Sequence, residues 1–416
     1  MNIYIYTFGC KVNQVESEHL LGRATESGLA VVTDASLADA VIINSCAVTE
    51  RAVNKLFTFI RKLKRQNPQI FALVTGCAAE LLADKLKENQ IDAVVTNAGK
   101  KDTIEYLLEK KDFYKSIDTR TELDIGYTPM KSRTRAFVKI QDGCDSFCSY
   151  CIIPTLRGKP VSKPENEIIN EVEKLVSEGY KEIVPVGIHI GKYGIEKETD
   201  LASLLEKLVK IEGDFRIRLT SIELNELNNR FINLLQNDKI CRHLHVPLQS
   251  GSTEILKLMN RHYTAEDYVT KLNMLKEKIE HLTLGADIIT GFPCETEQHF
   301  IESVNTINSS GIDFLHVFQY SDRKGTAASN MTNKVKGEIK KERAERLRLI
   351  GDELKAKAAK RCVGSSFRVL AQKDGYGITD NYFDVKLPEN CKPNHFYTLN
   401  IYDCDDKCNL YGDKNE

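Results

Sequence analysis

The sequence lacks an excess of charge of either sign, because 58 lysines and arginines balance 59 aspartates and glutamates and leave a formal net charge of −1. A polyanionic partner must therefore be met by a local basic patch. The sequence also lacks an apolar run near the ~18 residues of a membrane-spanning helix, and it starts without the basic and apolar regions of a secretory signal. We therefore expect a cytoplasmic protein with no membrane partner.

The composition is that of an ordinary globular protein, and the chain has many cysteines. Its 416 residues suffice for about three domains, and 28% charged with 42% hydrophobic residues excludes a disordered or fibrous chain. In a reducing compartment, 12 cysteines favour metal binding or catalysis over disulfide bonds.

The first hundred residues predict a parallel sheet. Short β-branched runs at residues 2–6, 40–44, 70–75 and 93–96 alternate with helical patterns. Cys10, Cys46 and Cys77 each follow one of the first three runs. Because the carboxyl ends of parallel strands meet at one edge of the sheet, we expect the three thiolates to converge on one metal centre. The alternative is that they are three unrelated buried cysteines.

A second cysteine group, Cys144, Cys148 and Cys151, follows a predicted strand at residues 136–140 with the spacing CxxxCxxC. Three thiolates in one loop fit three irons of a cubane cluster and leave the fourth iron to a chelating small molecule. A zinc site usually has a fourth protein ligand, so a zinc knuckle fits poorly.

The pattern continues with strands predicted at residues 182–186, 216–220, 243–248, 284–289 and 314–320, separated by helices. Six such units predict a partial (β/α)6 barrel, whose ligands bind at the carboxyl ends of the strands. The fold class is therefore α/β.

The motif CxxxCxYC resembles that of radical S-adenosylmethionine (SAM) enzymes, and the three earlier cysteines give the chain the layout of the methylthiotransferases. Residues 7–14, TFGCKVNQ, and 140–144, IQDGC, most resemble the branch that modifies N6-threonylcarbamoyladenosine next to the anticodon of tRNA.

This resemblance implies a transferase with two 4Fe-4S clusters. Cys144, Cys148 and Cys151 would hold the cluster that cleaves SAM to a 5′-deoxyadenosyl radical. Cys10, Cys46 and Cys77 would hold the cluster that carries the sulfur, which a second SAM methylates. The implied product carries a methylthio group on C2 of the adenine, and the implied partners are a tRNA anticodon loop and an electron donor such as flavodoxin or ferredoxin.

The resemblance also suggests which residues contact SAM. The candidates are Tyr150, Gly187, Gln249, Ser250, Arg261 and Asp287. Arg157 is a further candidate for carboxylate pairing. The alternatives are plain packing for Tyr150, turn formation for Gly187, and solvent or RNA phosphate as the partner of either arginine. His243 and His245 are read as core residues that satisfy hydrogen bonds, and His189 is likewise given no special role.

Residues 334–361 contain 11 lysines and arginines against 5 acidic residues on a helical pattern, which makes them a candidate contact for RNA phosphate or a solvated linker helix. Residues 362–416 alternate like the strands of a small antiparallel barrel. The resemblance identifies this part as a TRAM-like RNA-binding domain, although its 6 basic and 9 acidic residues disfavour phosphate.

We therefore divide the chain into residues 1–115, a methylthiotransferase domain; 130–333, a radical SAM barrel; 334–361, a basic linker helix; and 362–416, a TRAM-like domain. The alternatives for function are methylthiolation of isopentenyladenosine in tRNA or of a ribosomal protein aspartate, and a non-enzymatic iron-sulfur protein that binds RNA.

Overall fold

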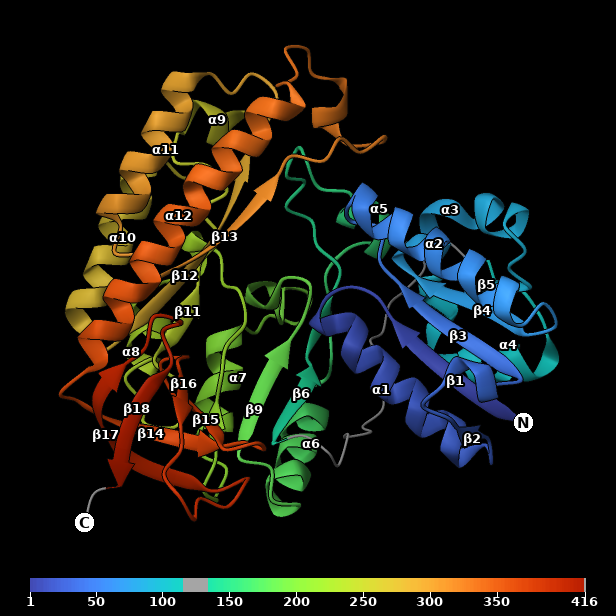
Figure 1. Cartoon of the computed structure of the whole chain (residues 1–416), viewed down its shortest axis with the longest axis horizontal. Coiled ribbons are helices and arrows are strands. Elements are labelled where there is room, and N and C mark those ends of the chain that lie inside the picture. Colours follow the sequence, from blue (N-terminus) through green and yellow to red (C-terminus); the bar gives the residue numbers. More distant parts are fainter. Residues whose placement is uncertain (115–133, 415–416) are drawn as a thin grey trace.

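The computed structural model describes residues 1–114 and 134–414, which form an N-terminal sheet domain, a central open barrel and a C-terminal closed barrel (Figure 1). The α/β class predicted from the sequence is confirmed. The predicted domain boundaries at residues 115 and 130 lie outside the described residues, and the division of the chain stays a prediction.

The N-terminal sheet has five parallel strands in the order β2-β1-β3-β4-β5. The strands are β1 (Asn2–Thr7), β2 (Ala30–Val31), β3 (Ala40–Ser45), β4 (Phe71–Gly76) and β5 (Ala93–Val95). The helices are α1 (Lys11–Glu26), α2 (Glu50–Gln66), α3 (Cys77–Glu88) and α4 (Thr103–Glu109). All six residues of β3 are buried, because helices cover both faces of the sheet. Alternate residues enter different cores, Ile43 with Leu56 of α2 and Ile42 with Leu20 of α1.

The central domain is built from two three-stranded parallel sheets. One contains β6 (Arg135–Lys139), β9 (Glu182–Val186) and β10 (Arg216–Ile217), and the other β11 (His243–His245), β12 (Thr283–Thr290) and β13 (Phe314–Gln319). Single parallel bridges, Ile217 to Ile240 and Ser221 to His245, connect the two sheets. The six strands therefore form the partial barrel that the sequence predicts.

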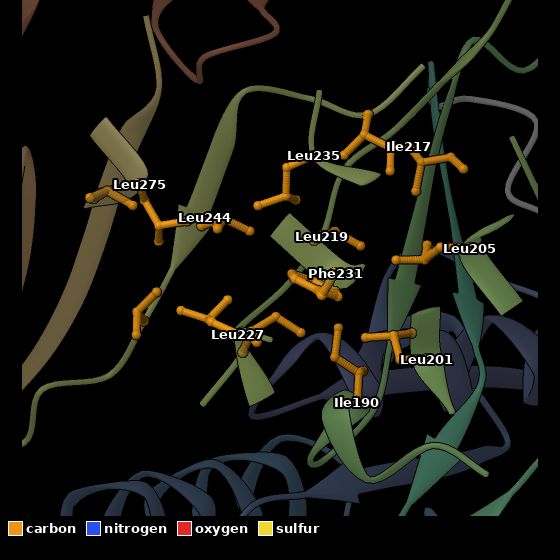
Figure 2. Packing of buried hydrophobic residues seen from close by; sticks show 14 of the residues in the cluster. Ile190, Leu201, Leu205, Ile217, Leu219, Leu227, Phe231, Leu235, Leu244 and Leu275 are labelled. Atoms are coloured by element: carbon orange, nitrogen blue, oxygen red, sulfur yellow. The ribbon is translucent and has the colours of Figure 1, made fainter. Parts of the chain in front are cut away.

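Helices cover the outer face of this barrel. They are α6 (Glu165–Ser177), α7 (Leu201–Leu208), α8 (Asn229–Leu234), α9 (Thr253–Leu258), α10 (Ala265–Lys278), α11 (Glu297–Ser309) and α12 (Gly337–Cys362). The short helix α5 (Ile153–Arg157) instead packs on the N-terminal domain through Leu156. A short hairpin of β7 (Gln141–Asp142) and β8 (Val161–Ser162) adjoins the first strand. Figure 2 shows part of the core, in which Leu244 of β11 and Leu275 of α10 belong to one cluster with Phe231 of α8. Because side chains alternate along a strand, the residues flanking Leu244 face the inside of the barrel.

The C-terminal domain is a closed barrel of five strands in the order β14-β15-β16-β18-β17. They are β14 (Ser366–Ala371), β15 (Tyr376–Thr379), β16 (Asp384–Lys386), β17 (Phe396–Cys404) and β18 (Leu410–Lys414). The small antiparallel barrel expected from the sequence is present, and one of its pairings, between β16 and β18, is parallel. An odd number of strands cannot alternate direction all the way round a closed ring, so one parallel pair is unavoidable.

The C-terminal barrel is fixed to the amino ends of the central strands. Arg216 donates to the carbonyls of Arg368 and Ile378 at 2.9 Å each. The ring of Tyr382 stacks on His243 with centroids 4.4 Å apart. This domain therefore closes the end of the central barrel opposite to the carboxyl ends of the strands, as Figure 1 shows.

Candidate active site

The sheet topology brings Cys10, Cys46 and Cys77 to one edge of the N-terminal sheet. They follow the adjacent strands β1, β3 and β4, whose ends are in register from Thr7 to Asn44 to Thr75. Burial, followed by the proximity of Cys77 and Cys10, raises the pKa of the Cys46 thiol. The fold therefore places all three cysteines at one sheet edge, and their binding of one metal centre stays a prediction.

Two glycines allow the loops of this edge to approach one another. Gly9 has a φ of +118°, and a Cβ there would lie 3.0 Å from the Cβ of Cys46. Gly76 has a φ of +93°, and a Cβ there would lie 2.5 Å from the carbonyl oxygen of Ser45. Both positions therefore require glycine, because a side chain there would clash with the neighbouring loop.

The loop with Cys144, Cys148 and Cys151 follows β6 and the first strand of the β7–β8 hairpin. The amide of Cys144 donates to the carbonyl of Gly158 at 3.0 Å, and that of Cys151 to the carbonyl of Cys148 at 2.9 Å, so the backbone folds the loop. Burial, assisted by the neighbouring Cys148 and Cys144, raises the pKa of Cys151 to about 12. The three thiols therefore lie close enough to influence one another.

His189 and Glu226 form a hydrogen-bonded chain with this loop. The Nδ1 atom of His189 lies 3.4 Å from the sulfur of Cys144, and its Nε2 atom lies 2.5 Å from Oε1 of Glu226. Burial opposes the charged imidazole, but these two contacts raise the pKa of His189 to about 10. Neither His189 nor Glu226 is among the site residues predicted from the sequence. The short segment Ile188–His189 after a strand gave no signal that a carboxylate 37 residues later would meet it.

Arg261 lies against the same loop, and Tyr150 is part of it. The Nη1 atom of Arg261 is 3.5 Å from the sulfur of Cys148, and its guanidinium pairs with both carboxylate oxygens of Glu223. Burial raises the pKa of Tyr150 well above its usual value, and the neighbouring Cys148 adds to the rise. Two residues singled out from the sequence are thus brought together with the cysteines.

The other candidates for SAM contacts lie at strand ends or on the inner face of the barrel. Gly187 directly follows β9, and a Cβ there would lie 2.9 Å from the side-chain oxygen of Gln141. Gln249 follows β11 with a φ of +65°, and its amide donates to the carbonyl of Asp287 at 2.8 Å. The hydroxyl of Ser250 is used within its own turn, where it accepts from the amide of Ser252 at 3.2 Å.

Asp287 lies between two histidines rather than at the end of β12. Its Oδ1 atom is 3.0 Å from Nε2 of His245 and 3.4 Å from Nδ1 of His316. Burial opposes ionisation, but the two histidines lower the pKa of Asp287. The potential ligand atoms of these three residues all lie within 4.8 Å of one another. The set can therefore accept hydrogen-bonding groups or a cation on the inner face of the barrel.

Buried charges connect the two cysteine groups across the domain interface. Glu16 of α1 accepts from Lys100 at 2.6 Å, from Lys139 at 2.7 Å and from Arg157 at 2.7 Å. Arg157 also pairs with Asp142 at 3.0 Å, two residues before Cys144. With 1% of its side chain exposed, Arg157 is neither solvated nor a contact for RNA.

The network reaches the N-terminal cysteines through Asn13. Its side-chain oxygen accepts from Arg157 at 3.1 Å and lies 3.4 Å from the sulfur of Cys10. Ile152 and Leu156, which follow the second cysteine group, pack into the core of the N-terminal domain. The two cysteine groups therefore adjoin one buried interface.

A partial parallel barrel with this cysteine loop is the core of a radical SAM protein, and the model described as the radical SAM superfamily matches residues 138–307. The model described as uncharacterized protein family UPF0004 matches residues 2–96. The chain belongs to the radical SAM methylthiotransferase family, because relatives with that activity in their names match nearly its whole length.

The threonylcarbamoyladenosine tRNA methylthiotransferase MtaB of Bacillus subtilis (strain 168) is 36% identical over 92% of this chain and 89% of its own. The tRNA-2-methylthio-N(6)-dimethylallyladenosine synthase of Thermodesulfovibrio yellowstonii is 36% identical over 93% of this chain and 94% of its own. Among solved structures, the radical SAM methyltransferase TsrM of Kitasatospora setae has a similar fold, with a TM-score of 0.59 and 12% identity over 94% of this chain and 83% of its own.

None of the helices formed by residues 1–114 and 134–414 combines the length and apolar character needed to cross a bilayer.

Proposed function

We propose that this chain transfers a methylthio group to C2 of N6-threonylcarbamoyladenosine beside the anticodon of a tRNA. The observation that carries the proposal is the pair of separate three-cysteine sites, one at the edge of the N-terminal sheet and one after β6. Radical formation needs only the second site, so the first is free to supply sulfur. Relatives named for this substrate in B. subtilis, Aquifex aeolicus and Thermotoga maritima support the choice of base.

The spacing of the cysteines fits two 4Fe-4S clusters better than two single ions. In the described part of the chain, neither group has its three sulfur atoms all within 4.8 Å of one another. Sulfur atoms that share one zinc at ~2.3 Å would be only about 3.8 Å apart. A cubane offers each cysteine its own iron and leaves a fourth iron open in each site.

When bound, the clusters and SAM supply the one-electron chemistry at the base and the sulfur that is transferred. The chain's own side chains hold and shield these groups. Arg261, fixed by Glu223, places a positive charge beside Cys148, and His189, held by Glu226, offers a hydrogen bond to the sulfur of Cys144. Tyr150, within the loop, packs against the cluster that contains Ile255 and Phe292.

The remaining assignments follow from the same proposal. Gly187, Gln249 and Ser250 would contact SAM near the carboxyl ends of the strands, and Asp287 would face the bound adenosine or base from inside the barrel. A small redox protein such as flavodoxin or ferredoxin would deliver the electron. The C-terminal barrel would be the TRAM-like domain.

Anaerobically reconstituted protein incubated with SAM, dithionite and tRNA tests the substrate, with nucleosides measured by mass spectrometry. Methylthiolated product should form on tRNA that carries the threonylcarbamoyl group and not on tRNA that lacks it. Product only on isopentenylated adenosine would instead give this chain the activity named for the T. yellowstonii relative. Product only on a ribosomal protein would contradict the RNA substrate.

A further inference from the structure

We infer that an exposed basic stripe on α2 binds the phosphate backbone of the RNA whose loop enters the active site, an inference that rests on the proposed function. The stripe consists of Arg51, Lys55, Lys62 and Arg65, all exposed. Their spacing places them on one face of the helix. The opposite face packs on the sheet through buried Leu56, Ile60 and Leu63, so the stripe faces away from the sheet.

The charges of the α2 stripe are available to a ligand. Glu50, in the first turn, is the only acidic residue of α2. Among ion pairs within residues 1–114 and 134–414, α2 contributes only Lys64, which pairs with Asp92 at 2.6 Å. A row of cations without carboxylate partners in that part of the chain is the electrostatic pattern that binds nucleic acid phosphates.

The stripe begins next to the active site. Helix α2 starts four residues after Cys46. Arg323, in the segment after β13, donates to the carbonyl of Val48 at 3.1 Å, which brings the carboxyl end of the barrel against the start of the helix. From Arg51 to Arg65 the helix then extends about 21 Å outward. A nucleic acid stem that follows its own loop out of the site would run along such a row.

Helix α12, the basic segment singled out from the sequence, is less suited to this role. Arg343 is buried and pairs with Glu295 at 2.7 Å and with Glu297 at 3.0 Å. Arg346 also pairs with Glu297 at 3.2 Å, and Arg361 pairs with Asp313. These pairs hold α12 on the barrel and match the charges of the three arginines with carboxylates.

An acidic electron-donor protein is the competing partner for the stripe. The straight row of charges on one helix matches a charged rod better than the compact surface of a small protein. The stripe also starts at Cys46 of the proposed sulfur-bearing site, whereas electrons must reach the site of Cys144. Both observations favour RNA.

The test compares two triple variants of the full-length reconstituted protein. Lys55→Glu/Lys62→Glu/Arg65→Glu changes the stripe, and Arg348→Glu/Lys357→Glu/Lys360→Glu changes three exposed residues of α12 by the same total charge. Binding of an anticodon stem-loop is measured by fluorescence anisotropy over a range of salt concentrations. The stripe variant should bind at least tenfold more weakly, and the slope of log affinity against log salt should fall by about 2 to 3 for three lost phosphate contacts. The α12 variant should keep the wild-type slope.

Equal losses in both variants, or no loss in either, would overturn the assignment. The assignment would also be overturned if the stripe variant kept the wild-type salt slope but cleaved SAM slowly with reduced flavodoxin and normally with dithionite. That result would assign the stripe to the donor protein. Iron content and circular dichroism check folding, and if the glutamate variant is unfolded, Lys55→Gln/Lys62→Gln/Arg65→Gln must show the same reduction in slope. If RNA binding depends on the stripe but no product forms on threonylcarbamoylated RNA, the role of the stripe is supported and the proposed substrate is contradicted.

Discussion

Glu182 illustrates how single buried charges organise this molecule. It is fully buried on β9 and pairs with Arg216 at 2.7 Å and with Arg218 at 2.9 Å. The same arginines donate to backbone carbonyls of the C-terminal barrel. Burial opposes ionisation, but Arg218 and Arg216 together lower the pKa of Glu182 to about 2. One carboxylate therefore positions both arginines that attach the C-terminal domain.

Glu182→Gln should lower the free energy of unfolding by about 3–5 kcal/mol at pH 7, because it leaves two buried guanidinium groups without a charged partner. The folded-state pKa lies below the usual value, so the stabilisation is complete above about pH 4.5 and is lost as the pH falls toward 2. Denaturant unfolding from pH 7 to pH 3 checks this dependence. Glu173→Gln, at an exposed position on α6, is the control; an equal loss there would contradict the explanation.

At the scale of elements, the carboxyl ends of strands supply both cysteine groups. β1, β3 and β4 end in register, and the glycines before Cys10 and Cys77 let the following helices start close together. The second group needs only one loop, because its three cysteines lie within eight residues. The two sites can therefore form independently, each within its own domain.

We predict that anaerobic reconstitution loads about eight irons per wild-type chain and about four into either triple alanine variant, Cys10/Cys46/Cys77 or Cys144/Cys148/Cys151, if each site holds four irons. Iron and sulfide analysis together with Mössbauer spectroscopy measures the loading. A wild-type chain that saturates near four irons would contradict the two-cluster arrangement.

The two groups should also separate by activity. Replacing Cys144, Cys148 and Cys151 by alanine should abolish 5′-deoxyadenosine formation from SAM under dithionite. Replacing Cys10, Cys46 and Cys77 should preserve that cleavage and remove the methylthiolated product. Liquid chromatography measures 5′-deoxyadenosine and the methylthiolated nucleoside. Loss of SAM cleavage in the second variant, with four irons still bound, would contradict the roles assigned to the two cysteine groups.

At the scale of the whole molecule, the buried network around Glu16 joins the N-terminal domain to the barrel. Burial would raise the pKa of Glu16, but Arg157, Lys100 and Lys139 hold it well below the usual value. The carboxylate is therefore charged and surrounded by three cations, with Asp142 as the second acid. The network fixes the relative position of the two cysteine sites.

Glu16→Gln should lower the free energy of unfolding by about 3–5 kcal/mol, since three buried cations would retain a single carboxylate. We expect SAM cleavage to persist while methylthiolated product falls, because the sulfur-bearing site loses its fixed position relative to the barrel. Thermal unfolding and the ratio of the two products measure this. Glu26→Gln, at the exposed end of the same helix, should behave as wild type.

The amino-acid sequence by itself determined the repeating strand-helix order, the parallel sheet, the partial barrel and the two groups of cysteines. These features depend on periodicity and on spacing along the chain, which are local properties. The sequence did not reveal β18, whose short strand carries little periodic signal, or the parallel pairing that closure of five strands requires.

Only the tertiary structure decided which charges meet. Glu16 and Arg157 are 141 residues apart, and Arg343 meets Glu295 across 48 residues. Whether an arginine is free to bind phosphate depends on such partners, which a count of charges along the chain does not reveal. The hydrogen bond between His189 and Glu226 likewise joins residues that are 37 positions apart in the sequence. Local pattern predicts the element on which a side chain lies, whereas packing of distant elements determines the environment that sets its chemistry.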